Sequence, residues 1–292
     1  MKKKFIIILL LSNHLLFGQG KWERKFEQLG TQLPTPNNYR SASGAPGKDY
    51  WQQRADYDMK IFLDDEKQKL IGSEKITYSN NSPDNLSYLW VQLDQNVRSN
   101  ESETPLINTN RMSYALDGKR LQSITNNYSN ADGGRFNGGF KINSVSDEKN
   151  ISLKYTIIKT MMRIDLENSL KPGENFIFNI DWSYNINDRM SVGGRGGYEY
   201  FPDDNNYSYT IAQFYPRMVV YDDKEGWQNK QFLGRGEFAL NFGDFNLEIT
   251  VPSDFIVGAT GSLENPENVL SKNELDKYNL AKKTYDKPVI IV

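Results

Sequence analysis

A side-chain period of two recurs along most of this chain. Its clearest run is Phe176 to Tyr184, in which Phe, Phe, Ile, Trp and Tyr occupy every second position. Successive side chains of a strand point to opposite faces of a sheet, so this run predicts a strand with one almost wholly aromatic face. Phe245 to Val251 alternates in the same way, and Pro252 then removes a backbone donor and ends the strand. The fold must therefore bury many strands that are apolar on one face only.

Turn-forming residues separate these runs and favour antiparallel pairing. Tyr57–Leu63 and Leu70–Tyr78 are predicted to form a hairpin about the Asp64–Lys67 turn. The run Leu170–Glu174 holds Pro and Gly where a tight turn needs them. Further strands are predicted at 86–93, 151–157, 162–166 and 255–257. No amphipathic helix of ordinary length divides the strands, so we predict an all-β, antiparallel two-sheet sandwich.

The first twenty residues have the pattern of an export signal. Lys2 to Lys4 are basic, Phe5 to Phe17 form a short apolar stretch, and Gly18 to Gly20 offer small residues suited to cleavage. We therefore predict that 1–20 is a signal peptide and that the mature chain is periplasmic or secreted, with no membrane span after cleavage. An uncleaved anchor and a buried helix are the alternatives.

Composition narrows the range of partners. The formal net charge of -2 gives no reason to expect nucleic acid or an anionic membrane as a partner. The chain has no cysteine, so no disulfide can form and stability must come from the core. A hydrophobic content of 38% excludes a disordered chain.

The chain is predicted to have three parts after the signal. Residues 21–49 are rich in Pro, Asn, Ser and Gly and suggest a linker-like arm, 50–268 hold the β-domain, and 269–292 are a connector. The last stretch, DKPVIIV at Asp286–Val292, has the β-branched residues of a strand. We expect it to start a further domain, so that the chain is a fragment; a natural C-terminal strand is the alternative.

The scarcity of histidine limits the catalytic sites that this chain can form. A zinc site of the HExxH kind needs two His one helical turn apart, with Glu as the general base. The only His is His14, inside the predicted signal. The mature chain can therefore hold no such site, and Ser-His-Asp and Cys-His catalysis are excluded on the same ground.

A glycine-rich stretch and three aspartate pairs are further candidates for binding or catalytic sites. Gly193–Gly197 lacks the Lys-Ser/Thr ending of a phosphate loop and precedes an extended stretch, which favours a loop or a bulge. Three adjacent aspartate pairs could bind metal or act as acid and base, but paired carboxylates in loops usually stabilise turns. The pairs are Asp64–Asp65, Asp203–Asp204 and Asp222–Asp223.

Three blocks of the chain carry a more specific pattern. They are YWQQRADYDMKIFLDDEKQKLIGSEKITYSNNSPDNLSYLWVQLDQN at Tyr50–Asn96, IAQFYPRMVVYDDKEGW at Ile211–Trp227, and GEF, FGDFNLEITVP and VGATG within Gly236–Pro266. In this order they resemble the N-terminal β-domain of the M1 (gluzincin) family of zinc aminopeptidases. The resemblance implies a saddle-like β-domain that packs on a thermolysin-like catalytic domain. The zinc ligands and the catalytic Glu would lie in that domain, beyond Val292.

The resemblance also implies one substrate-binding residue. In the family, a Gln or Glu of this domain lines the pocket for the substrate's N-terminal residue, and Gln213 in IAQFYPR matches it, with Arg217 as the Arg that follows. The chain departs from the family after that Arg, where MVVYDDKEGW replaces a Pro-Cys segment and Asp-Glu-Pro. A neutral amide oxygen can accept a hydrogen bond from a peptide α-ammonium. A strand-end Gln that is hydrogen-bonded to backbone is the alternative.

Two functions of different classes remain open. The chain is either the non-catalytic N-terminal domain of an exported M1-like zinc metallopeptidase, or a free-standing exported β-sandwich that binds peptide, glycan or protein. In the first case the partners are its own catalytic domain and a peptide substrate. A domain that docks on a partner should expose a large apolar patch, and a self-sufficient module should not.

Overall fold

A computed structural model describes residues 36–104, 115, 118, 136–234, 236 and 238–292. The chain divides into two compact units, one that ends at Val251 and one that begins at Pro252. The predicted signal peptide, and the arm up to residue 35, lie outside the described residues. The predicted boundaries at residues 20, 49 and 268 stay predictions.

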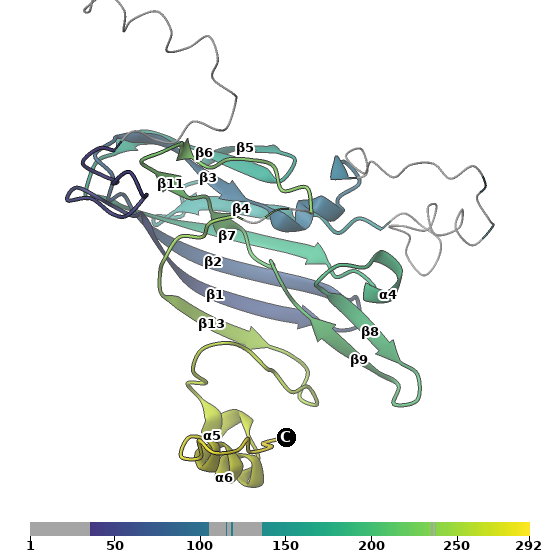
Figure 1. Ribbon diagram of the computed structural model, residues 1–292. Coiled ribbons are helices and arrows are strands. Elements are labelled where there is room, and N and C mark those ends of the chain that lie inside the picture. Colours follow the sequence, from purple (N-terminus) through teal and green to yellow (C-terminus); the bar gives the residue numbers. More distant parts are fainter. Residues whose placement is uncertain (1–35, 105–114, 116–117, 119–135, 235, 237) are drawn as a thin grey trace, which may run out of the picture. The chain divides into compact units, whose positions relative to one another are not determined.

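The first unit is built on two large sheets that lie in two layers (Figure 1). The five-stranded sheet has the order β13-β1-β2-β7-β4 and the four-stranded sheet the order β10-β3-β6-β5. The strands of the five-stranded sheet are β13 (Phe245–Thr250), β1 (Arg54–Asp64), β2 (Lys69–Ser79), β7 (Asn175–Asn185) and β4 (Lys141–Asp147). Those of the four-stranded sheet are β10 (Arg217–Met218), β3 (Leu86–Gln92), β6 (Met161–Leu170) and β5 (Lys154–Ile158).

Short hairpins and helices complete the described structure. The hairpins are β8 (Gly197–Phe201) with β9 (Asn206–Thr210) and β11 (Tyr221–Asp222) with β12 (Gly226–Trp227). The first unit also contains the 3-10 helix η1 (Asp94–Arg98) and the one-turn helix α4 (Arg189–Val192). The second unit contains α5 (Pro266–Val269) and α6 (Lys272–Ala281). Helix α6 begins at a capping box in which Ser271 and Glu274 each satisfy the other's backbone N–H.

The core lies where the inner faces of the two sheets meet. The largest fully buried side chains include Tyr78, Phe178 and Trp182 of the five-stranded sheet and Leu89 and Met162 of the four-stranded sheet. A direct hydrogen bond also joins the layers, because the Met218 N–H donates to the Tyr57 hydroxyl oxygen at 2.9 Å. The alternating aromatic face of Phe176 to Tyr184 is thus part of this core, as the sequence predicts.

One glycine makes this packing possible. Gly72 of β2 lies opposite Trp182 of β7, and a Cβ at Gly72 would stand 2.2 Å from the indole ring. The ring therefore occupies the space above the glycine, and a larger residue would displace the largest fully buried side chain of the sheet.

The predicted all-β sandwich is confirmed, and the predicted hairpin and the 170–174 turn are present as β1–β2 and the β6–β7 connection. One pairing differs from the antiparallel prediction, since β13 lies parallel to β1, with Tyr57 opposite Phe245 and Phe62 opposite Thr250. Parallel strands require a crossover connection, and nearly the whole unit supplies it between β1 and β13. Side-chain period carries no information about strand direction, so the sequence could not reveal this.

Two further strand predictions are wrong. Residues 255–257 form no strand, although the turn at Ser253–Asp254 that precedes them is present. Residues 286–292 form no strand either. Both runs have strand composition, but a strand also needs a neighbouring ladder, and the described structure gives these two runs none.

Candidate functional site

An open cavity of about 590 Å³ lies in the first unit beside the 3-10 helix η1. We call it the arginine cavity. Its charged and polar lining comes from η1, from the glycine loop after α4, and from the segment that leads into β10. The residues concerned are Asp94, Arg98, Arg195, Gln213, Tyr215 and Arg217.

Gln213 is exposed and adopts a left-handed backbone conformation, with φ of 52°. This conformation is uncommon for a residue with a side chain and persists where the surroundings hold it. Gln95 supplies that hold, because its Nε2 donates to the backbone carbonyls of Ala212 and Gln213, both at 3.0 Å. The backbone of Gln213 is thus fixed at the lining of the arginine cavity.

Arg98 extends this arrangement to the glycine loop. Its Nη1 donates to Oε1 of Gln95 at 2.9 Å, which orients the amide that holds Gln213. A Cβ at Gly194 would lie 2.4 Å from Nη2 of Arg98, so the absence of a side chain at Gly194 lets the guanidinium lie against the loop. Arg98, Gln95 and the Gln213 backbone therefore form one connected hydrogen-bonded unit.

A buried ion pair forms part of the cavity wall. Nε of Arg217 donates to Oδ2 of Asp94 at 2.8 Å, and the two side chains are 10% and 1% exposed. The Arg217 guanidinium also lies 5.8 Å from the ring centroid of Phe238. A buried pair of this geometry fixes two segments that are 123 residues apart, and removal of either partner leaves a buried charge.

A carboxyl group behind the cavity has an unusual environment. Glu74 of β2 is 1% exposed, and neither of its carboxyl oxygens has a hydrogen-bond partner among the described residues. Burial raises the pKa of Glu74 well above its ordinary value. Burial, and then the charge of Glu74, raise the pKa of the neighbouring Tyr215 to about 12. Tyr215 contacts the ring of Tyr57 edge-on at 5.3 Å, so these groups form a buried polar cluster against the cavity.

Of the residues proposed from the sequence, Gln213 and Arg217 line the same cavity. The glycine stretch forms a loop that ends in β8, and its Gly193, Gly194 and Arg195 line the same cavity. Two of the three aspartate pairs, Asp64–Asp65 and Asp222–Asp223, have partners among the described residues. Asp222 accepts from the backbone N–H groups of Lys224 and Glu225.

The other members of these two pairs have side-chain partners. Asp223 pairs with Arg40 at 2.8 Å, and Asp64 pairs with Lys67 at 3.1 Å. Asp65 accepts from the Tyr209 hydroxyl. Asp203 and Asp204 are exposed in the turn of the β8–β9 hairpin.

Gln95, Arg98 and Arg195 were not identified from the sequence. Gln95 lies inside the first resembling block, and Arg195 lies inside the glycine stretch, but neither pattern assigns these residues a role. Their function depends on contacts across 118 residues, as between Gln95 and Gln213, which no local pattern encodes.

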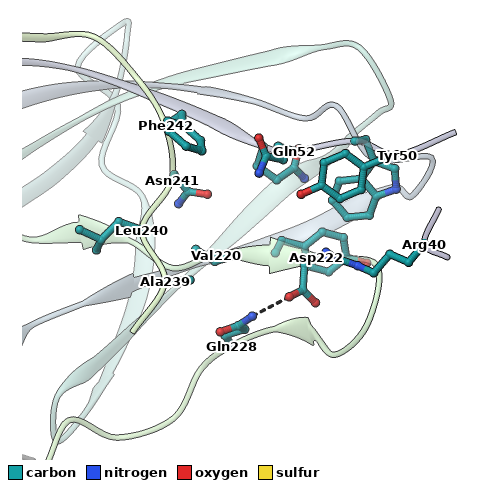
Figure 2. A pocket seen from close by; sticks show the side chains of 13 residues that line it. Arg40, Tyr50, Gln52, Val220, Asp222, Gln228, Ala239, Leu240, Asn241 and Phe242 are labelled. Carbon is teal, nitrogen blue, oxygen red and sulfur yellow. Dashed lines mark hydrogen bonds between the residues drawn. The ribbon is translucent and has the colours of Figure 1, made fainter. Parts of the chain in front are cut away.

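A second, smaller cavity of about 140 Å³ has a largely aromatic and amide lining (Figure 2). Tyr50, Trp51, Tyr221 and Phe242 line it, and Trp51 stacks on Tyr221 at 5.7 Å. Figure 2 shows the amide of Gln228 directed to the carboxylate of Asp222, to which it donates at 2.5 Å. We call this the aromatic cavity.

The residues present do not fit a zinc ion. Among the described residues, no group of three or more His, Cys, Asp and Glu side chains stands close enough to hold a metal. The chain's single His14 lies outside the described residues, and Cys is absent from the sequence. No catalytic step through zinc is therefore assigned to this chain. The described part of the chain also contains no helix that is long and apolar enough to cross a membrane.

Comparison with known proteins finds similarity among solved structures. No family model matches the chain, and no curated protein matches it either. A mutant M1 zinc metallopeptidase from Deinococcus radiodurans with a bound Tyr-Ser-Ala substrate shares 13% identity over 73% of this chain and 35% of its own, with a TM-score of 0.36. The M1 zinc metallopeptidase from the same organism shares 12% identity over 72% of this chain and 34% of its own, with a TM-score of 0.34. The chain thus spans about a third of the length of these structures. Similarity at this level does not define a family for the chain.

Proposed function

We propose that this chain is the non-catalytic N-terminal β-domain of an exported M1-like zinc metallopeptidase, and that its arginine cavity lines part of the substrate cleft. The proposal rests on the position of Gln213. The residue that the sequence resemblance marks for binding the substrate's N-terminus is exposed at a cavity, with its backbone held by Gln95.

In this proposal the domain positions the substrate and does not react with it. The Gln213 amide oxygen accepts a hydrogen bond from the α-ammonium of a bound peptide. The zinc would belong to a catalytic domain outside this chain, where it would activate a water for attack on the peptide bond. The chain's own contribution is to fix the end of the peptide relative to that domain.

Exposed apolar side chains support the proposal that a second domain docks on this one. Leu240 and Phe242 are 61% and 69% exposed, and Phe245 and Ile249 of the edge strand β13 are 52% and 37% exposed. Phe245 and Ile249 lie on β13, Phe242 is joined to Arg54 of β1 by a single parallel bridge, and Leu240 lies two residues earlier in the chain. We call these four residues the β13 row. A row of this kind is expected where a second domain covers the edge.

The first test is the intact mass of the protein in its native host, detected with an antibody to this domain. We expect a species far heavier than the 33.6 kDa of this chain, with bound zinc and chelator-sensitive aminopeptidase activity. In that species Gln213→Ala should lower kcat/KM by about tenfold through loss of a charge-assisted hydrogen bond. Gln52→Ala, at an exposed position that lines the aromatic cavity, is the matched control.

Two results would contradict the proposal. One is a native species at or below 33.6 kDa without zinc. The other is chelator-sensitive peptidase turnover by this chain alone, because its sequence has no HExxH motif and its described residues offer no metal site.

The alternative is a free-standing module that binds peptide, glycan or protein, and the aromatic cavity is the observation that favours it. The Nε1 of Trp51 is buried and has no hydrogen-bond partner among the described residues, so a ligand oxygen could accept from it. Stacked rings beside a free indole donor suit a sugar ring or a peptide carbonyl. A native species of 33.6 kDa or less would direct the search to this cavity.

A further inference from the structure

The charges around the arginine cavity constrain what it can bind. Among the described residues that line it, four have acidic or basic side chains: three are arginines, and the fourth, Asp94, is paired with Arg217. Arg195 is exposed, and its guanidinium makes no hydrogen bond or ion pair with any described residue. The lining therefore favours an anionic group.

This preference bears on how a peptide can bind. An α-ammonium at Gln213 would stand in a cavity lined by Arg98, Arg195 and Arg217, and their field opposes it. Gln213 is neutral and cannot offset that field. A carboxylate on the same peptide residue would offset it, and guanidinium groups are suited to hold a carboxylate through paired N–H donors.

We propose that the arginine cavity selects peptides whose first residue is acidic, with the Asp or Glu side-chain carboxylate bound by Arg195 next to Arg98. This inference rests on the proposed function, since it takes the ligand to be a peptide bound by its N-terminal residue. It adds the substrate class, which neither the fold nor the family resemblance specifies.

Four peptide amides test the proposal against this protein by titration calorimetry: Glu-Ala-Ala, Gln-Ala-Ala, and the N-acetylated form of each. The C-terminal amide removes the second carboxylate. We expect Glu-Ala-Ala to bind at least about tenfold more tightly than Gln-Ala-Ala, and the difference to shrink as salt is raised. Arg195→Gln should abolish the difference, and Arg195→Lys should retain part of it.

Arg163→Gln is the control outside the arginine cavity, because Arg163 lies on β6 and is paired with Asp165. Unfolding temperatures of the Arg195 variants should match the parent, since Arg195 is exposed. Equal affinity for the Glu and Gln peptides overturns the inference, as does a Glu preference that survives Arg195→Gln. Absence of binding by all four peptides also overturns it.

Acetylation separates this inference from the proposed function. If the Arg195-dependent Glu preference persists while acetylation leaves affinity unchanged, the anion site stands and the role of Gln213 in binding the ammonium fails. If acetylation weakens binding in the parent but not in Gln213→Ala, while Glu and Gln peptides bind equally, the proposed function stands and the acidic selectivity fails.

Discussion

At the scale of single residues, Glu74 has the least favourable environment of the described carboxyl groups. It lies on the inward face of β2 between the sheets, without a hydrogen-bond partner among the described residues. A carboxylate there would lose its hydration without compensation, so burial disfavours the charged form and raises the pKa of Glu74. The sequence places Glu74 at an inward position of an alternating strand, but it cannot show that no partner reaches it.

Glu74 should make stability depend on pH. Its folded-state pKa is raised well above the ordinary value of 4.5, so the folded protein keeps a proton that the unfolded chain loses above that pH. The contribution of Glu74 to the free energy of unfolding is therefore fully present below pH 4.5. It falls by about 1.4 kcal/mol per pH unit as the pH rises toward the folded pKa. Glu74→Gln should unfold at higher urea than the parent at pH 7, with the gap closing toward pH 4.5.

The exposed turn residue Glu66 provides the control, because Glu66→Gln should leave the pH dependence unchanged. Parallel pH profiles for the parent and Glu74→Gln would show that Glu74 ionises alike in both states.

At the scale of elements, η1 and β10 are held together by side chains more than by backbone. β10 pairs with β3 over only two residues, and the Asp94–Arg217 ion pair joins η1 to it beside the arginine cavity. Arg217 was marked by the sequence as the Arg that follows Gln213, whereas its partner was unmarked. Two residues 123 positions apart become partners only when the chain folds.

Removal of one partner of this pair should be costly. Arg217→Met leaves the Asp94 carboxylate buried without its cation, and we expect a loss of about 3–5 kcal/mol in the free energy of urea unfolding. The double variant Asp94→Leu with Arg217→Met should recover most of that loss, because it removes both charges. A single-variant loss below about 1 kcal/mol would mean that the pair is solvated in solution.

At the scale of the whole molecule, the chain consists of two compact units. The first unit buries an aromatic core between two sheets yet leaves the β13 row exposed, and β13 is an edge strand that pairs only with β1. Two members of this row, Phe245 and Ile249, belong to the apolar face of the strand that the sequence predicts at Phe245–Val251, yet both are exposed. The spacing of apolar residues along a strand shows which side chains share an apolar face. It does not identify the segment that packs on that face.

The exposed β13 row should make the isolated chain self-associate. We expect the average mass in sedimentation velocity to rise with protein concentration, and Leu240→Ser with Phe242→Ser to suppress the rise. Ile151→Ser, at a 60% exposed position outside the row, should have no such effect. A concentration-independent monomer of the parent would argue that the row is covered, and would weaken the proposal of a docking domain.

The sequence by itself determined the fold class, the turns, the exclusion of a His-based zinc site and the positions of seven strands, namely β1, β2, β3, β5, β6, β7 and β13. These features are local, because side-chain period, turn chemistry and residue identity act within a few neighbours along the chain. Tertiary structure alone decided the parallel pairing of β13 with β1, the cavity that gathers Gln213 and its arginines, the Gln95 contact that fixes Gln213, and the isolation of Glu74. Each of these depends on groups far apart in the chain, whose proximity results from packing the sheets and is not encoded in any single segment.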